Sequence, residues 1–260
     1  MEREPVIFNS GVVTATHFAP GETAHPAHTD CRTCGKEHLV NAHLRPQGGI
    51  FRFGVGQLCP ACAEAEHAAD EARRADAIQH ERLERWTAIC PPLYQQTEID
   101  RLPSAAQELI NDWQFGPKGL LLHGPTGAGK TRAAWMLLRR LALEGRSIRA
   151  MTANEFRLGV ASMFDGGGAW AARWIDTLNT VDVLFFDDLG KGRLTEAVES
   201  ELFGIVESRT AHLKPIVVTL NCDAKALRGM LTEDRGVPLM RRLADFTTTI
   251  DLRADEKKQP

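Results

Sequence analysis

The chain has 260 residues, of which 43% are hydrophobic and 25% are charged, so it has room for one α/β core and a small additional module. Its formal net charge of −3 argues against a protein that coats nucleic acid by bulk electrostatics, and any such contact must come from local basic patches. No stretch is long enough to span a bilayer, and residues 1–20 lack the pattern of an export signal, so we expect a cytoplasmic protein without membrane contacts.

The amino-terminal part contains two C-x₂-C pairs. The four cysteines are Cys31, Cys34, Cys59 and Cys62. Each pair on a tight turn can aim two thiolates at one ion, and two such turns complete a closed tetrahedral S₄ site. A site of this kind can hold together a unit that is too small for its own core. We therefore expect a structural Zn²⁺ module over residues 28–66, preceded by a tail over residues 1–27.

Other ligand sets and other uses of these cysteines stay open. His38 and His43 lie between the pairs and could replace one cysteine, although four thiolates already close the shell. Free thiols or a redox pair are an alternative, but redox C-x-x-C motifs usually occur singly beside a βαβ unit. The lack of an export signal argues against a disulfide framework.

A long helix is predicted after the cysteines. Residues 63–89 are rich in Ala, Glu and Arg and contain no Gly or Pro, and the helix should end before Pro91 and Pro92. The apolar positions are sparse and leave only a narrow stripe. We interpret residues 67–92 as a solvated linker helix, with a partner-binding helix as the alternative.

The strongest motif is a phosphate-binding loop that matches G-x-x-x-x-G-K-[ST] in full. It consists of Gly124, Pro125, Thr126, Gly127, Ala128, Gly129, Lys130 and Thr131. A predicted strand at 120–123 precedes it and a predicted helix at 131–144 follows it, as the motif requires. The inward N–H groups of such a loop and the helix dipole bind a polyphosphate. We expect Lys130 to contact the β- and γ-phosphates and the Thr131 hydroxyl to ligate Mg²⁺.

The remainder of the chain alternates helices with strands. Strands are predicted at 120–123, 147–151, 181–186, 215–220 and 246–252. Helices are predicted at 105–113, 131–144, 154–163, 169–178, 196–211 and 224–231. This alternation indicates an α/β fold, in which a parallel sheet has helices on both faces and ligands bind at the carboxyl ends of the strands.

Acidic and amide side chains end two of these strands. The apolar run 183–186 leads into Asp187 and Asp188, which is the Walker B pattern. We expect Asp187 to enter the Mg²⁺ shell directly or through water, and Asp188 to orient the attacking water. The strand at 215–220 ends at Asn221, whose amide would lie near the γ-phosphate; the alternative is that Asn221 caps the following turn.

From about residue 91 to residue 253 the chain resembles the DnaC/IstB-type branch of AAA+ ATPases, which includes bacterial helicase loaders and transposition helper ATPases. The motifs that carry the resemblance are Pro91-Pro92-Leu93-Tyr94, the phosphate loop, Asp187-Asp188-Leu189-Gly190 and the segments 202–209, 215–221 and 241–244. The resemblance implies an AAA+ P-loop core over residues 93–260 with a five-stranded parallel sheet. It also implies hydrolysis of ATP with Mg²⁺ in an ATP-dependent homo-oligomer.

By this resemblance Asn221 is the sensor-1 residue, and an arginine near Arg242 is the finger that reaches a neighbouring subunit's γ-phosphate. The chain departs from the family pattern in three places. An apparent insertion at residues 236–238 leaves Arg235, Arg241 and Arg242 all eligible as the finger. Asn221 follows Leu220, where small polar residues are more usual. After Leu252 we expect no helical lid with a second arginine sensor.

Family members engage single-stranded DNA in the helical region that corresponds to residues 154–176. Here Arg157, Phe164, Trp170 and Arg173 supply the cations and stacking rings that such binding uses, although aromatic residues at helical spacing also serve as core. The zinc module is where such loaders often dock their protein partner. Alternatively the module itself touches DNA through its basic residues, which are Arg32, Lys36, Arg45 and Arg52.

Four functions are therefore considered. The first is an ATPase that assembles on DNA and loads a replicative helicase. The second is an IstB-like transposition helper whose partner is a transposase. A P-loop kinase or metabolite transferase and a non-catalytic zinc adaptor are the remaining two. The adaptor is disfavoured because Lys130, Thr131, Asp187 and Asp188 are all present. Lys130, Asp188, Asn221 and Arg242 are the expected catalytic residues.

Overall fold

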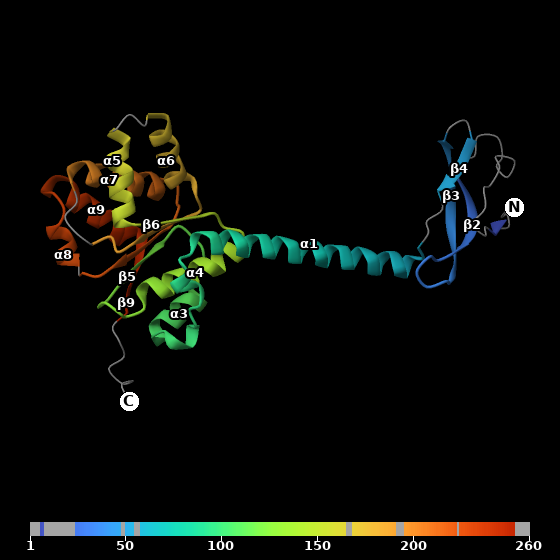
Figure 1. The fold of residues 1–260 in the computed structure, drawn as a ribbon, viewed down its shortest axis with the longest axis horizontal. Helices are drawn as coiled ribbons and strands as arrows, with labels where there is room; N and C mark the ends of the chain where they lie inside the picture. The colour runs from blue at the N-terminus through green and yellow to red at the C-terminus, as the bar shows by residue number, and fades with distance from the viewer. Residues whose placement is uncertain are drawn as a thin grey trace. The chain divides into compact units, whose positions relative to one another are not determined.

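The computed structural model describes residues 6–7, 24–47, 50–54, 58–164, 168–190, 195–222 and 224–252. The chain divides into two compact units, Met1–Ile78 and Gln79–Pro260. Helix α1 (Pro60–Ile89) belongs to both and is marked in Figure 1. None of the helices in the described part of the chain has both the length and the apolar character that crossing a membrane requires.

The described residues of the first unit form a four-stranded sheet in the order β1-β2-β3-β4. Its strands are β1 (Val6–Ile7), β2 (Ala24–Asp30), β3 (Glu37–Gln47) and β4 (Ile50–Gly54). Strand β1 runs parallel to β2, and the other two pairs are antiparallel. Of the expected tail at 1–27, residues 6–7 and 24–27 thus lie in strands, and the others are outside the described residues.

Helix α1 begins at Pro60, one turn earlier than predicted, because proline fits the first turn of a helix, where its missing N–H is not needed. Cys62 therefore lies on the helix, and the expected boundary between residues 66 and 67 falls inside it.

Near the end of α1, Trp86 is buried, and the Arg139 guanidinium lies 5.7 Å from the centre of its ring. Arg82 Nη1 donates to the Leu143 carbonyl at 2.8 Å. These contacts fasten the last turns of α1 to the end of α4 (Lys130–Leu143).

The described residues of the second unit form a five-stranded parallel sheet in the order β6-β7-β8-β5-β9, as predicted. Its strands are β5 (Gly119–His123), β6 (Ile148–Thr152), β7 (Val183–Asp187), β8 (Ile216–Leu220) and β9 (Thr247–Asp251). Side chains alternate between two buried clusters. On β7, for example, Leu184 and Phe186 face one cluster and Val183 and Phe185 face the other.

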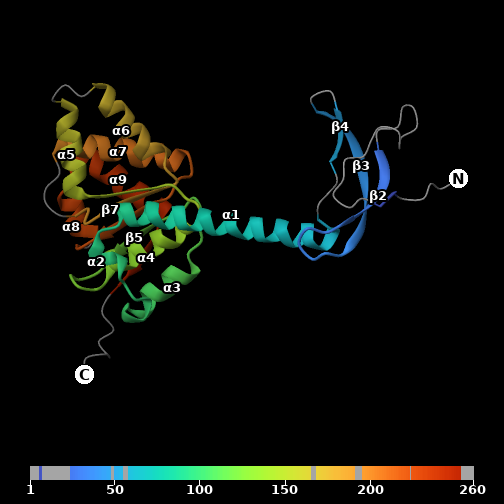
Figure 2. The ribbon, with the colours of Figure 1, turned by 45° about the vertical axis from the view of Figure 1, so that its right-hand side comes forward.

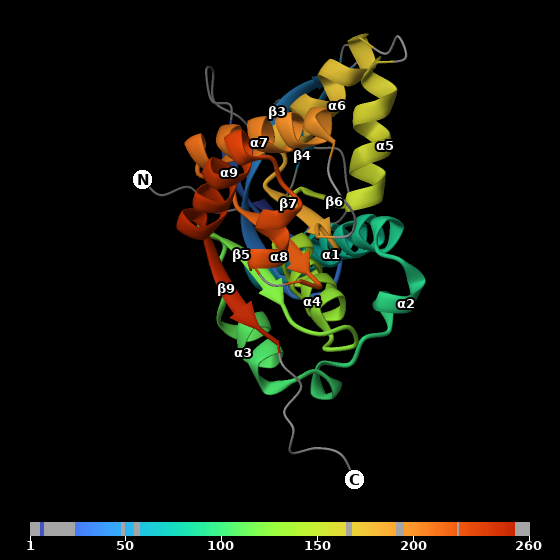
Figure 3. The same ribbon diagram turned by 90° about the vertical axis from the view of Figure 1, so that its left-hand side faces the viewer.

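Helices cover both faces of this sheet (Figures 1, 2 and 3). Helices α3 (Ser104–Asp112) and α4 lie on one face. On the other face lie α5 (Ala153–Phe164), α6 (Gly168–Thr180), α7 (Glu196–Ala211) and α9 (Glu233–Phe246). Among the described residues, three short helices complete the unit: α2 (Pro92–Gln95), the 3₁₀ helix η2 (Ile99–Arg101) and α8 (Ala224–Gly229).

Helix α9 was missed by the sequence analysis, which treated residues 236–238 as an apparent insertion. The structure places these residues inside the helix, although Gly and Pro are the poorest helix formers. Its start is fixed because the buried Glu199 carboxylate accepts hydrogen bonds from the Thr232 N–H and hydroxyl at 2.9 Å and 2.8 Å. Leu239 and Leu243 then bury one face of α9, so tertiary contacts override the local propensity.

Arg209 on α7 binds several backbone segments at the end of the sheet that lies opposite the phosphate loop. Its side chain is fully buried, and burial lowers the pKa of its guanidinium to about 10. The guanidinium donates to five backbone carbonyls, those of Leu178, Asn179, Val181, Asp182 and Pro215. These carbonyls belong to the end of α6 and to the segments that enter β7 and β8, so one side chain aligns the two strands that lead to the candidate site.

Candidate functional site

The predicted phosphate loop connects β5 to α4. Gly129 is the N-cap of α4 with φ of 83°, in the left-handed region that glycine adopts without strain. Gly124 makes a close backbone approach, since a Cβ atom there would lie 2.6 Å from the Leu252 carbonyl oxygen. Glycine is therefore required at both ends of the turn. The loop leads directly into the first turn of α4, where free N–H groups favour an anion.

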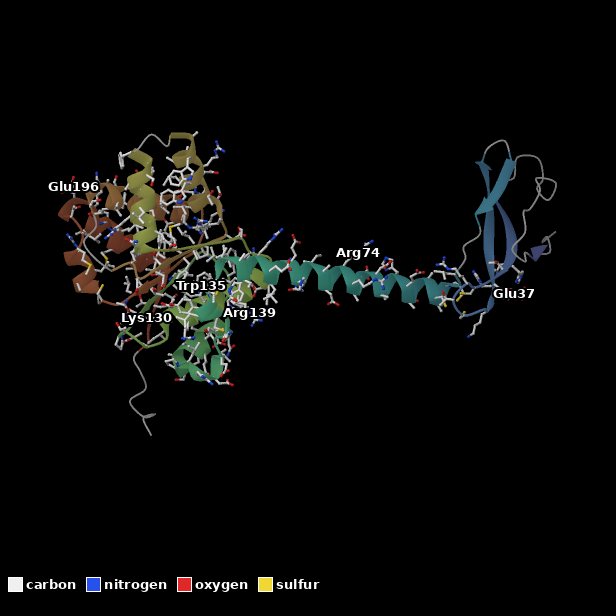
Figure 4. All side chains as sticks on the ribbon, in the orientation of Figure 1. Glu37, Arg74, Lys130, Trp135, Arg139 and Glu196 are labelled. Carbon is white, nitrogen blue, oxygen red and sulfur yellow. The ribbon has the colours of Figure 1, made fainter. Side chains whose placement is uncertain are left out.

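Lys130 begins α4 and is labelled in Figure 4. It is 5% exposed, and its Nζ donates to the carbonyls of Gly124 and Pro125, both at 2.9 Å. Burial lowers the pKa of Lys130, and the nearby carboxylates of Asp188 and Asp187 oppose that shift. The ammonium is thus held where a polyphosphate in the loop would meet it, with bonds that phosphate oxygens can replace.

Asp187 at the end of β7 meets the loop through Thr131. The Thr131 hydroxyl donates to Asp187 Oδ1 at 2.9 Å, and the Thr219 hydroxyl donates to the same oxygen at 2.6 Å. Burial raises the pKa of Asp187, and these two hydrogen bonds oppose the rise. Neighbouring oxygen ligands of an octahedral Mg²⁺ at about 2.1 Å lie about 3 Å apart. The Thr131 and Asp187 oxygens therefore fit one Mg²⁺ ion.

Asp188 is placed by a turn in the left-handed region, with φ of 56°. Its backbone N–H donates to the Thr219 hydroxyl at 2.8 Å, and its Oδ1 accepts a hydrogen bond from Asn221 Nδ2. The two predicted acids and the predicted amide thus form one connected polar group. Because a carboxylate can accept a proton from water, this group offers a general base beside the phosphate loop.

Thr219 is the site residue that sequence reasoning missed. It is fully buried, and its hydroxyl bonds both Asp187 and the backbone of Asp188. The signal was present, because Thr219 and Asn221 are two residues apart at the end of a strand and so point to the same face. A threonine in an otherwise apolar strand should therefore have been assigned to the candidate site together with Asn221.

The segment before the core also lies beside the site. Arg132, the residue after Thr131, donates from Nη1 to the Leu93 carbonyl at 3.2 Å, and its guanidinium lies 5.8 Å from the centre of the Tyr94 ring. Tyr94 stacks on Trp135 of α4 at 6.5 Å. Burial and then the charge of Asp187 raise the pKa of Tyr94. Helix α2 is therefore attached to the start of α4.

The three candidate finger arginines lie on α9, Arg235 near its start and the adjacent Arg241 and Arg242 near its end. Arg235 is in its first turn, next to the N-cap that Glu199 holds. Arg242 is near its end, where Nη2 donates to Glu207 Oε1 at 2.7 Å. A small cavity lined by Arg242 is also lined by Pro117 and Ile216, which precede β5 and begin β8. Arg242 thus lies beside the amino-terminal ends of the strands. The structure does not bring it to the chain's own phosphate loop.

The residues expected to contact DNA lie on α5 and α6. Phe164 and Trp170 are 71% and 47% exposed, so the core alternative does not hold for them. Arg157 Nη2 donates to Asn154 Oδ1 at 3.0 Å, and both line a cleft of about 450 Å³ together with Thr152, Ala153 and Asp188. Arg173 is exposed and donates from Nε to the Ala169 carbonyl. Of the glycine loop at 166–168, only Gly168 is described.

The four predicted cysteine ligands converge. Their Sγ atoms all lie within 4.8 Å of one another, and those of Cys34 and Cys59 are 3.8 Å apart. A tetrahedral Zn²⁺ with Zn–S bonds of about 2.3 Å requires S···S distances of about 3.8 Å. Backbone N–H donation from Cys59 lowers the pKa of Cys31 to about 5, whereas the side chain of Cys59 raises that of Cys62 to about 12. The four cysteines therefore fit one Zn²⁺.

Local structure explains this convergence. The first pair lies on the turn between β2 and β3, where Gly35 has φ of 70° and its N–H donates to the Cys31 carbonyl at 2.8 Å. The second pair lies at the start of α1. Among the side chains that the structure describes, the metal-binding group does not include His38. The side chains of His43, Arg45 and Arg52 lie outside the described ones.

Comparison with known proteins assigns the second unit of the chain to a protein family. Residues 93–237 match the family of IstB-like ATP binding proteins. The putative ATP-binding protein Rv3427c in an insertion sequence of Mycobacterium tuberculosis is 25% identical over 58% of this chain and 61% of that protein. The replicative helicase loader DnaC of Escherichia coli is 21% identical over 76% of this chain and 83% of that protein.

A solved structure shows the same fold. The crystal structure of DnaI superimposes with a TM-score of 0.53 and 21% identity, and covers 62% of this chain and 94% of that one. With the family match and the five-stranded parallel sheet, this confirms the predicted AAA+ P-loop core and the resemblance to the DnaC/IstB-type branch.

The four-cysteine group gives a prediction about metal content. We expect one Zn²⁺ per chain, and Cys34→Ser should reduce the bound zinc at least about tenfold, because a hydroxyl is a much poorer zinc ligand than a thiolate. Elemental analysis of purified protein measures this. The matched control is Cys222→Ser, which changes a cysteine outside the group. Equal zinc content in Cys34→Ser and wild type would contradict the site.

Proposed function

The chain belongs to the family of IstB-like ATP-binding proteins and is an AAA+ P-loop ATPase, and we propose that it acts in DNA replication as a helicase loader. The observation that carries the ATPase is the polar group in which Thr131, Asp187, Thr219, Asp188 and Asn221 are joined by hydrogen bonds beside the loop lysine. The likeness to the loader DnaC over 83% of that protein supports the loading role.

Lys130 and four residues of this group have roles in the proposed hydrolysis. Lys130 would bind the β- and γ-phosphates of ATP, and Thr131 and Asp187 would hold a Mg²⁺ ion, whose chemistry when bound is to neutralise charge on the phosphate oxygens. Asp188 accepts a proton as the water oxygen bonds to the γ-phosphorus and the bond to the ADP oxygen breaks. Asn221, which already donates to Asp188, orients that carboxylate. The products are ADP and phosphate.

The position of Arg242 supports a homo-oligomer in which one subunit completes its neighbour's site. Arg242 lies beside the amino-terminal ends of the strands, at the opposite end of the sheet from its own phosphate loop. It is hydrogen-bonded to Glu207, and 43% of its side chain is exposed. A guanidinium at this end of the sheet can contact the γ-phosphate bound by another copy, where it would stabilise the charge that develops in the transition state. Hydrolysis would then depend on assembly.

Two further contacts are proposed from the structure and the relatives. Exposed Phe164 and Trp170, with Arg157 and Arg173, offer rings and cations to single-stranded DNA. The zinc module, over residues 28–66, docks the protein partner, and residues 67–92 link it to the ATPase core. The partner in the first proposal is a replicative helicase.

The alternative function is a transposition helper ATPase whose partner is a transposase. The specific observation in its favour is the relative from an insertion sequence, Rv3427c, which is 25% identical. Both functions use the same ATPase core, so the partner decides between them. A P-loop kinase is disfavoured, because the family match and the fold are those of AAA+ ATPases.

A mixing experiment tests the role of Arg242. Lys130→Ala should lose about 10- to 100-fold in ATP affinity, because it removes charge-assisted hydrogen bonds to the phosphates, and Arg242→Ala should bind ATP but hydrolyse it poorly. In a mixture, the intact Arg242 of the first variant can serve the intact ATP site of the second. We therefore expect ATPase activity above the sum of the two variants alone.

Arg241→Ala is the comparison variant for that mixture, since Arg241 is the adjacent candidate arginine and is 83% exposed, and the proposal assigns the finger to Arg242. It should retain most of the wild-type rate. A merely additive mixture, or full activity of Arg242→Ala, would argue against a finger acting between subunits.

Capture of the partner tests the proposed function itself. The immobilised 260-residue chain is incubated with the replicative helicase of the same organism, in ATP or in ADP, and the retained helicase is quantified. We expect capture that differs several-fold between the two nucleotides, because ATP organises the oligomer, and Lys130→Ala should abolish that difference. Capture of a transposase and not of the helicase would favour the alternative function.

A further inference from the structure

The guanidinium of Arg242 is held by a carboxylate on the neighbouring helix. Helices α7 and α9 lie side by side (Figures 1 and 3). Arg242 Nη2 on α9 donates to Glu207 Oε1 on α7 at 2.7 Å. A hydrogen bond between two charged groups is shorter and stronger than one between neutral groups. The direction of the Arg242 side chain is therefore set by α7 as well as by its own helix.

Both partners of this bond stand on backbone that is fixed by buried neighbours. On α7, Val206 precedes Glu207 and is 2% exposed, and the buried Arg209 bonds the carbonyls that enter β7 and β8. On α9, Leu243 follows Arg242 and is 3% exposed. The freedom left to the pair is therefore the rotation of two side chains, and the hydrogen bond between them restricts that rotation.

The guanidinium still has donors for a second partner. The side chains of Arg242 and Glu207 are 43% and 44% exposed, so the pair borders solvent. An arginine side chain has five N–H donors in one plane, and the bond to Glu207 uses one of the two on Nη2. Because the group is planar and rigid, fixing one edge also fixes the direction of the other N–H groups. A phosphate of another molecule can thus be bound while Glu207 stays in place.

The adjacent Arg241 lacks this arrangement. Its Nε lies 3.8 Å from Asp245 Oδ2, one turn further along the same helix, and 83% of its side chain is exposed. Exposed ion pairs of this kind within one helix are weak and leave both side chains free to move. Of these two neighbouring arginines, Arg242 is therefore the one that a second helix orients.

From this contrast we propose that Glu207 is a positioning residue for ATP hydrolysis in a neighbouring subunit, where it directs Arg242 toward the γ-phosphate. The inference rests on the proposed function, which supplies the homo-oligomer and the role of Arg242. A cation lowers the barrier most when it is already in place as charge develops, since no reorganisation is then needed. Glu207 acts only through Arg242 and touches neither ATP nor the attacking water.

Replacement of Glu207 tests this role. Glu207→Ala should lower kcat for ATP hydrolysis about tenfold and leave ATP affinity unchanged, because the chain's own phosphate loop is intact. Glu207→Gln keeps an acceptor oxygen and should recover most of the wild-type rate. The matched control is Asp245→Ala, which removes the carboxylate beside Arg241 and should keep the wild-type rate.

A mixing experiment separates positioning from a merely structural role. Glu207→Ala retains its own ATP site, and Lys130→Ala retains the Glu207–Arg242 pair, so their mixture should hydrolyse ATP faster than the sum of the two variants alone. A mixture of Glu207→Ala with Arg242→Ala should stay additive, because both variants are impaired on the same side of the contact. Glu207→Leu, which also lacks an acceptor, replaces Glu207→Ala in both mixtures if the alanine variant does not fold.

The outcomes distinguish this inference from the proposed function. A wild-type kcat in Glu207→Ala, or a merely additive mixture of Glu207→Ala with Lys130→Ala, would overturn the positioning role. The proposed function would stand in that case if Arg242→Ala and Lys130→Ala still complement each other. Absence of ATP hydrolysis in wild type would instead overturn the proposed function.

Discussion

The candidate site depends on the hydroxyl of one buried threonine. Thr219 donates to the Asp187 carboxylate at 2.6 Å and accepts from the Asp188 N–H at 2.8 Å, so a single oxygen sets the positions of the proposed metal ligand and of the proposed base. A hydroxyl can do this because it is both a donor and an acceptor. The neighbouring Leu189 N–H also donates to the Thr219 carbonyl, which fixes the turn after the acids.

The sheet makes this interaction possible. Strand β8 lies between β7 and β5, so Thr219 stands between the strand that supplies the acids and the strand that leads into the phosphate loop. Arg209 aligns the opposite ends of β7 and β8 by bonding the carbonyls that enter them. The site is thus held by buried side chains, while α5, α6 and α9 carry exposed apolar side chains.

Much of the core could be predicted from the sequence because its signals are local. The strands are short apolar runs, and the phosphate loop and Asp187-Asp188 are contiguous motifs, so each was placed within one or two residues. Helix α9 was missed because its stability comes from Glu199, which is distant in sequence. Thr219 was missed because its role is a contact between strands, which becomes visible only in three dimensions.

Replacement of Thr219 tests the account most directly. Thr219→Val keeps the shape but leaves the Asp188 N–H and the Asp187 oxygen without their shared partner, which should cost about 1–3 kcal/mol of site organisation. We predict that kcat for ATP hydrolysis falls about 10- to 100-fold with little change in KM, and that Thr219→Ser stays close to wild type. Equal kcat in Thr219→Val and wild type would contradict the claim that this hydroxyl positions the catalytic acids.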